Sequence, residues 1–116
     1  MKTFCFDIDG VICQTQNNNY KSSKPNKKII NLINKLYLKN RIIIFTARYM
    51  GRSDGRVNLA KKKGLKFTKN QLKRWGLNYH KLIMGKPSYD IFVDDKNLEF
   101  TSNWHIKLKK KFETDF

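Results

Sequence analysis

The chain has 116 residues, a formal net charge of +16 and 40% hydrophobic residues. This length allows one domain with a working core and leaves no room for a second globular unit. The apolar runs are too short to span a membrane, and Met1 lies too close to the first predicted strand for a signal peptide. Two cysteines are too few for a disulfide framework or a zinc site, so we expect a cytoplasmic protein without a membrane partner.

The positive charge allows an anionic partner: a phosphorylated metabolite, a nucleic acid or an acidic lipid. Lys supplies most of it, and Arg occurs only at positions 41, 48, 52, 56 and 74. Specific readers of phosphates and bases favour Arg for its fork geometry. Abundant Lys, Asn and Ile are also typical of an AT-rich coding sequence, which raises the Lys content without selection for binding. The charge therefore selects no partner.

Residues 2–7 predict the first strand, an apolar run that ends in Asp7 and Asp9 with Gly10 directly after them. Cys5 is interpreted as a small core residue of this strand. Two carboxylates so close repel each other, and a divalent cation would relieve that repulsion. The pattern therefore indicates a metal or ligand site at the carboxyl end of a buried strand.

Residues 11–24 are polar and predict a loop, which is either a small flap over that site or a plain connector. A helix follows, with Pro25 in its first turn and Asn40 at its end. Its core-facing stripe is Ile29, Leu32, Ile33 and Leu36.

Residues 42–45 predict a second buried strand that ends in Thr46-Ala47-Arg48. Because strand, helix and strand in this order imply a parallel crossover, we expect Thr46 at the same sheet edge as Asp7. Residues 49–56 predict a mobile, cationic loop.

Two helices are expected next. The first covers 56–63 and stops at Gly64. The second opens with a capping box at 68–71, turns Trp75 inward and stops at Gly76.

The last third of the chain predicts two strands, 80–84 and 91–93. The first leads to Lys86 and the second to Asp94 and Asp95. A short helix near 96–102, an edge strand over 105–109 and frayed final residues complete a single domain over 1–116.

Four predicted strand ends thus carry a common set of polar residues: Asp7 and Asp9, Thr46, Lys86, and Asp94 with Asp95. This set, over about residues 3–96, resembles the four motifs of the haloacid dehalogenase superfamily. The Asp-x-Asp form of the first motif is similar to the phosphatase and phosphotransferase branch. The resemblance implies an α/β fold: a three-layer α/β/α Rossmann-like domain with a mostly parallel sheet.

The intervals between the motifs hold no cap domain, so the chain is similar to the minimal, cap-less phosphatases. Such an open site would either accept a large substrate or borrow a wall from a neighbouring subunit in a homo-oligomer.

The resemblance implies a Mg²⁺-dependent phosphomonoester phosphatase that works through an aspartyl-phosphate. Asp7 would be the nucleophile. Asp9 would protonate the leaving oxygen and then deprotonate the attacking water, while its backbone carbonyl helps to hold the metal. The Thr46 hydroxyl and nearby backbone N–H groups, such as that of Ala47, would grip the phosphate oxygens.

Lys86 would neutralise charge between the nucleophile and the phosphoryl group. Asp94 would complete a Mg²⁺ site of oxygen ligands with Asp7 and Asp9. Asp95 would either ligate through water or orient Lys86.

Three arginines near the predicted mouth of the site are candidates for substrate binding: Arg48, Arg52 and Arg56. Each could instead form a local salt bridge. Arg48 is the strongest candidate, because it lies two residues after Thr46.

Residues 71–80, with 85–87 and 94–96, resemble small phosphatases associated with capsule and surface-polysaccharide synthesis in bacteria. A phosphorylated sugar, or another small phosphorylated building block such as an amino-alcohol conjugate, is the implied partner. The alternatives are a 3′-phosphatase that processes nucleic-acid ends and a non-catalytic binding module. Trp75 is interpreted as a packing residue, and His80 is given no chemical role.

Overall fold

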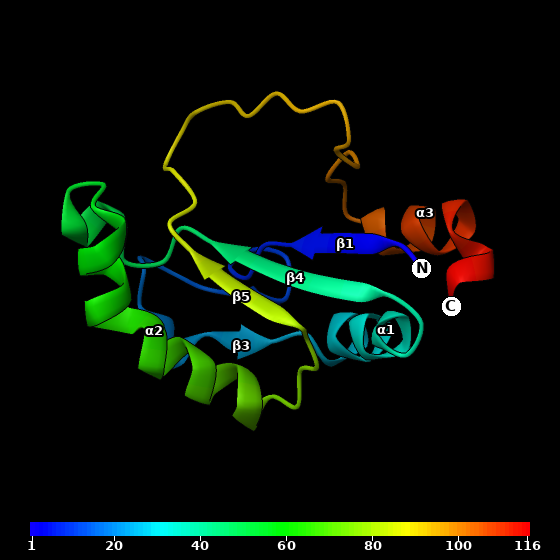
Figure 1. Ribbon diagram of the computed structural model, residues 1–116, viewed down its shortest axis with the longest axis horizontal. Helices are drawn as coiled ribbons and strands as arrows, with labels where there is room; N and C mark the ends of the chain where they lie inside the picture. The colour runs from blue at the N-terminus through cyan, green and yellow to red at the C-terminus, as the bar shows by residue number, and fades with distance from the viewer.

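The computed structural model describes all 116 residues. Its main sheet has three parallel strands, β1 (Thr3–Phe6), β4 (Arg41–Thr46) and β5 (Lys81–Met84), in the order β1-β4-β5 (Figure 1). Because all three run in one direction, their carboxyl ends meet at one edge. The α/β class, the parallel sheet and the absence of a cap are confirmed, as are three of the five predicted strands.

The helix α1 (Lys27–Tyr37) connects β1 to β4, and its predicted apolar stripe is buried in the core. Pro25 is not in its first turn. It lies in β3 (Lys24–Pro25), which pairs antiparallel with β2 (Cys13–Gln14). Asn26 caps the helix, since its side chain accepts from the backbone N–H groups of Lys28 and Ile29.

The helix α2 (Val57–Arg74) is continuous, so the predicted stop at Gly64 and the predicted new start near Thr68 are wrong. Gly64 serves close packing instead: a Cβ there would lie 2.0 Å from the Tyr49 ring. Thr68 is buried inside the helix and caps nothing. The predicted stop at Gly76 is confirmed, and the φ of this glycine is +73°.

The two faces of the sheet differ in burial. Phe4, Phe6, Ile42 and Ile44 are buried in a core to which all three helices contribute residues. The alternate residues face the other way and none is buried: Thr3, Cys5, Arg41, Ile43, Phe45, Lys81 and Ile83. In a three-layer domain, a second layer of helices would bury this face. Here the face is only partly covered. The expectation that Cys5 is a core residue is wrong.

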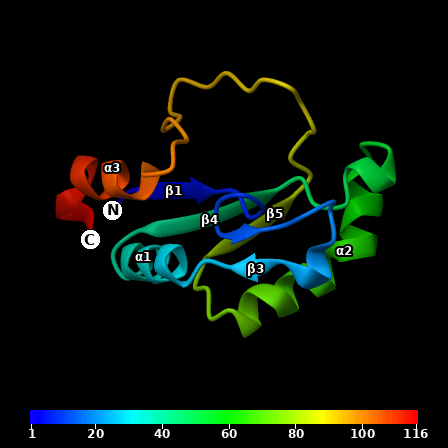
Figure 2. The same cartoon turned by 180° about the vertical axis from the view of Figure 1, so that it is seen from behind.

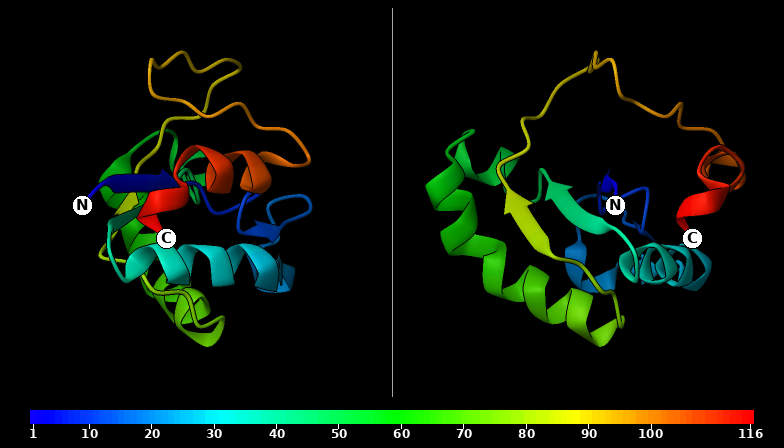
Figure 3. Two further views of the ribbon diagram at one scale, coloured as in Figure 1. Left: turned by 90° about the vertical axis from the view of Figure 1, so that its right-hand side faces the viewer. Right: turned by 45° about the vertical axis from the view of Figure 1, so that its right-hand side comes forward.

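Residues 85–103 contain no helix or strand. In Figures 1 and 2 this segment arches away from the sheet, and the two views of Figure 3 agree. The predicted strand over 91–93 and the predicted helix near 96–102 are therefore wrong. Three apolar residues are too few to form a strand without a paired neighbour, and Ile91 and Val93 are 81% and 89% exposed.

The chain closes with α3 (Trp104–Lys111) and the short 3₁₀ turn η3 (Glu113–Asp115). The predicted edge strand over 105–109 is wrong, because Trp104 and Leu108 are both buried at helical i, i+4 spacing. The final residues are not frayed: Asp115 forms a salt bridge of 2.9 Å with Lys2, and its carbonyl accepts from Asn40. None of the helices is long and apolar enough to cross a membrane.

Candidate active site

The carboxyl edge of the sheet brings together three of the predicted site residues. Asp7 directly follows β1, Thr46 ends β4, and Lys86 follows β5 after Gly85. The Lys86 Nζ lies 2.7 Å from Asp7 Oδ2, although the two residues are 79 positions apart. The backbone N–H of Lys86 donates to the Thr46 carbonyl at 3.1 Å. The parallel register thus gathers these residues as predicted.

The pair of Asp7 and Lys86 is half-buried, with side chains 30% and 16% exposed. Burial acts to lower the pKa of Lys86, but its interactions with Asp7 and Tyr89 outweigh burial, so the pKa is raised. Asp7 Oδ1 accepts from the backbone N–H of Ile8 at 2.7 Å. A carboxylate is therefore held beside a stable cation at the rim of the sheet.

Asp9 follows two residues after Asp7, and Arg48 binds its side chain. The Arg48 Nε donates to Oδ2 at 2.9 Å, and Nη2 donates to Oδ1 at 3.0 Å. The Thr15 hydroxyl also donates to Oδ1, at 2.5 Å. Both carboxylate oxygens of Asp9 therefore have partners.

Arg48 is not placed to contact a substrate. Its side chain is 0% exposed, and its third hydrogen bond runs from Nη1 to Gln71 Oε1 at 2.6 Å. The expectation that Arg48 binds substrate is contradicted here, and the reason is physical: a buried guanidinium needs partners for its donors, and Asp9 and Gln71 provide them.

Thr46 is fully buried, and its Oγ1 accepts from the backbone N–H of Arg48 at 3.1 Å. This bond shapes the turn after β4. The half-buried Ala47 lies in that turn, and its carbonyl accepts from the backbone N–H of Met50. Thr46 therefore supports the turn at this edge from inside the protein.

The loop over 11–24 is anchored and not free. Its 3₁₀ turn η1 (Tyr20–Ser22) places the buried Tyr20 ring 5.0 Å from the Tyr49 ring. The exposed Arg52, in the turn η2 (Gly51–Ser53), lies over both rings and donates to the Asn18 carbonyl. The predicted substrate residue Arg52 therefore ties the two loops together.

Arg56 precedes α2 and lines a groove of about 570 Å³ with Val57, Asn58, Leu59 and Lys62. A Cβ on Gly85 would lie 2.7 Å from the Val57 side chain, so one wall of this groove packs against the chain just before Lys86. Of the three predicted arginines, Arg56 has the position best suited to a substrate.

The structure does not bring Asp94 and Asp95 to this edge. Both are exposed in the arching segment, and Asp94 Oδ1 accepts only from the nearby backbone N–H of Lys96, at 3.1 Å. No three His, Cys, Asp or Glu side chains come together in a way that could hold a metal. As arranged, the residues do not fit a Mg²⁺ site.

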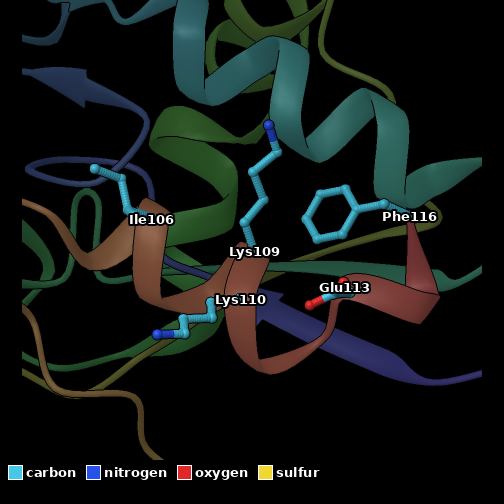
Figure 4. A pocket seen from close by; sticks show the side chains of 5 residues that line it. All are labelled: Ile106, Lys109, Lys110, Glu113 and Phe116. Atoms are coloured by element: carbon cyan, nitrogen blue, oxygen red, sulfur yellow. The ribbon is translucent and has the colours of Figure 1, made fainter.

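Figure 4 shows a second groove, of about 340 Å³. It is formed by α3 and the chain end, beside the amino end of β1 (Figure 1). Its lining residues are Ile106, Lys109, Lys110, Glu113 and Phe116. Because no salt bridge pairs a carboxylate with a cation among its lining residues, it is the weaker candidate.

The sequence patterns missed three residues of the site: Thr15, Tyr20 and Gln71. The sequence pattern predicts that Gln71 belongs to a capping box at a helix start. It lies instead inside α2, where its side chain bonds to Arg48. Thr15 and Tyr20 lie in a polar loop without periodicity, where no spacing signal exists. Trp75 packs against the core as expected. His80, to which the sequence assigns no chemical role, has a structural one: its Nδ1 accepts from the backbone N–H of Ile42 at 3.0 Å.

No protein-family model and no curated protein matches the sequence. Among solved structures, the fold is similar to that of a Vibrio cholerae protein, described only as a structural-genomics target. The TM-score is 0.78 and the identity 23%, over 96% of this chain and 98% of the other. At this identity the similarity shows a shared fold, which extends over nearly all of both chains.

Proposed function

We propose that the protein is a phosphomonoester phosphatase that forms an aspartyl-phosphate on Asp7. The observation that carries the proposal is the 2.7 Å pair of Asp7 and Lys86 at the carboxyl edge of the parallel sheet. This edge is where open α/β sheets bind ligands. The Lys86 cation is placed to offset the negative charge of a phosphoryl group that Asp7 attacks.

In the first step, an Asp7 carboxylate oxygen attacks phosphorus and the bond from phosphorus to the leaving oxygen breaks. The leaving oxygen takes a proton from Asp9. In the second step, Asp9 takes a proton from water, the water oxygen attacks phosphorus, and the bond from phosphorus to Asp7 breaks. Inorganic phosphate and the free Asp7 carboxylate result. Arg48 and Thr15 hold the side chain of Asp9 at this edge through hydrogen bonds to its carboxylate oxygens.

The superfamily resemblance adds Mg²⁺ to this proposal, as the ion that would help to neutralise the phosphate. The arrangement of Asp94 and Asp95 does not supply its ligands. An assay therefore tests the dependence on Mg²⁺, and the two proposed reaction steps do not require the ion.

The proposed substrate is a small phosphorylated sugar or building block of capsule or surface polysaccharide. This part rests on the sequence resemblance of residues 71–80, 85–87 and 94–96. The groove lined by Arg56 and Lys62 is consistent with an anionic substrate beside Lys86.

A phosphate-release screen tests the proposal. The purified chain is given sugar phosphates, phosphorylated amino alcohols and their conjugates, nucleotides and 3′-phosphorylated oligonucleotides, with Mg²⁺ and with EDTA. We expect phosphate release from sugar phosphates, and the arm with EDTA shows whether that release requires Mg²⁺. No release from any phosphomonoester would refute the proposal. A large preference for the oligonucleotide, lost at high salt, would instead favour the nucleic-acid 3′-phosphatase.

A further inference from the structure

The buried network around Arg48 is the part of the molecule that the proposed mechanism leaves unexplained. Arg48 is the largest fully buried side chain, in a protein whose other cations are mostly exposed. A buried guanidinium is costly unless its donors are bonded and its charge is paired. Its three nitrogens make three strong bonds, to both oxygens of Asp9 and to Gln71.

The network is itself held from two other elements. Gln71, on α2, donates from Nε2 to the Tyr20 carbonyl at 2.6 Å, and this bond orients its Oε1 toward Arg48. The Tyr20 ring lies under the guanidinium, 4.7 Å from Cζ. The loop over 11–24 and the helix α2 thus fix the position of Arg48.

The chemistry of this contact requires an arginine. A guanidinium donates two parallel hydrogen bonds and so sets the plane of the carboxylate that accepts them. An ammonium at the same place would pair with the charge of Asp9 without setting that plane. The two bonds from Arg48 therefore hold the carboxylate of Asp9 in one orientation.

We infer that Arg48 is a positioning residue for Asp9, with Gln71 and Tyr20 as its supporting frame. It holds the Asp9 carboxylate in the orientation from which a proton can be exchanged with the leaving oxygen or with water. This inference rests on the proposed phosphatase function, in which Asp9 is the acid and base. It assigns Arg48 a role in turnover rather than in substrate affinity.

The test compares Arg48→Lys with wild type in kcat and KM for the best substrate of the screen. Losing the two-pronged contact misorients Asp9, so we expect kcat to fall about 10- to 100-fold and KM to change less than about 3-fold. Arg74→Lys, the same substitution at an exposed site on α2, is the matched control and should leave both constants unchanged.

A second variant keeps the test informative if Arg48→Lys fails to fold. Gln71→Met leaves Arg48 and Asp9 in place and removes only the support, so we expect kcat to fall about 3- to 10-fold with KM unchanged. The thermal midpoint of each variant is measured alongside, so that misfolding is not mistaken for lost positioning.

Two results would overturn the inference while leaving the proposed function intact. A rise of KM with unchanged kcat in Arg48→Lys would make Arg48 a substrate-binding residue. Unchanged constants with a lowered thermal midpoint would make it purely structural. Inactivity of wild type on all phosphomonoesters would instead refute the proposed function, and the catalytic role of Arg48 with it.

Discussion

The sheet edge and the arching segment both carry residues of the predicted site, but only the sheet edge brings them together. Asp7, Thr46 and Lys86 follow or end paired strands, and Lys86 reaches Asp7 at 2.7 Å. Asp94 and Asp95 follow a run that pairs with no strand, and both are exposed. A motif is therefore placed by the backbone pairing beneath it, and order along the chain is not enough.

Asp7, the proposed nucleophile, should show the largest effect on the sheet-edge side of this comparison. Asp7→Asn replaces the carboxylate with an amide that cannot form the acyl phosphate, so we expect kcat to fall by at least about 10³-fold. Phosphate release under single-turnover conditions measures it. Asp54→Asn is the control, because Asp54 is exposed and Asn tolerates its left-handed backbone. Near-normal turnover by Asp7→Asn would remove Asp7 from its role.

The two regions should also differ in their contribution to folding, and a matched pair of isoleucines tests this. Ile44 is fully buried and Ile91 is 81% exposed. We expect Ile44→Ala to lower the free energy of unfolding by about 2–5 kcal/mol. Ile91→Ala should change it by no more than about 0.5 kcal/mol. Urea unfolding measures both, and equal losses would show that residue 91 is packed against the sheet in solution.

Lys86 joins the two regions, and its removal should weaken catalysis less than removal of Asp7. Lys86→Met leaves the carboxylate without its cation, so we expect kcat to fall about 10²-fold. Lys81→Met, at an exposed position of β5, is the control and should retain activity. Equal activity of the two variants would show that the ion pair of Asp7 and Lys86 does not contribute to turnover.

The stability contributed by Lys86 should depend on pH. Its pKa is raised above the ordinary value of 10.5, because its interactions with Asp7 and Tyr89 outweigh burial. The stabilisation by its ammonium form is therefore fully present below that value and is lost as the pH rises through the raised pKa. We expect wild type to exceed Lys86→Met in urea midpoint at about pH 8 and to lose that advantage progressively as the pH rises above 10.5. A constant difference would contradict this assignment.

The smallest effect should come from the arching segment itself. Asp94→Asn and Asp95→Asn alter exposed side chains, so we expect the free energy of unfolding to change by less than about 0.5 kcal/mol in each. Urea unfolding checks this. If either variant also loses turnover while its stability is unchanged, the segment must reach the sheet edge during catalysis, and the contrast drawn above applies only to the resting protein.

Residues with strong periodicity were predictable. The buried strands around Phe4, Ile44 and Met84 and the stripe of α1 follow from runs and spacings that report local structure directly. The ends of these strands then place Asp7, Thr46 and Lys86. Three of the failures share one cause. Gly64, the run at 91–93 and the alternation over 105–109 are each compatible with two structures, and packing partners outside the segment select between them.

The amino-acid sequence alone was sufficient to predict a parallel α/β domain with an aspartate and a lysine at one sheet edge, because strand direction carries side chains to that edge whatever their neighbours are. The burial of Arg48 against Asp9, the continuity of α2 past Gly64 and the isolation of Asp94 from Asp7 depended on the folded chain. Each depends on contacts between residues far apart in the chain, and no local pattern encodes such a contact.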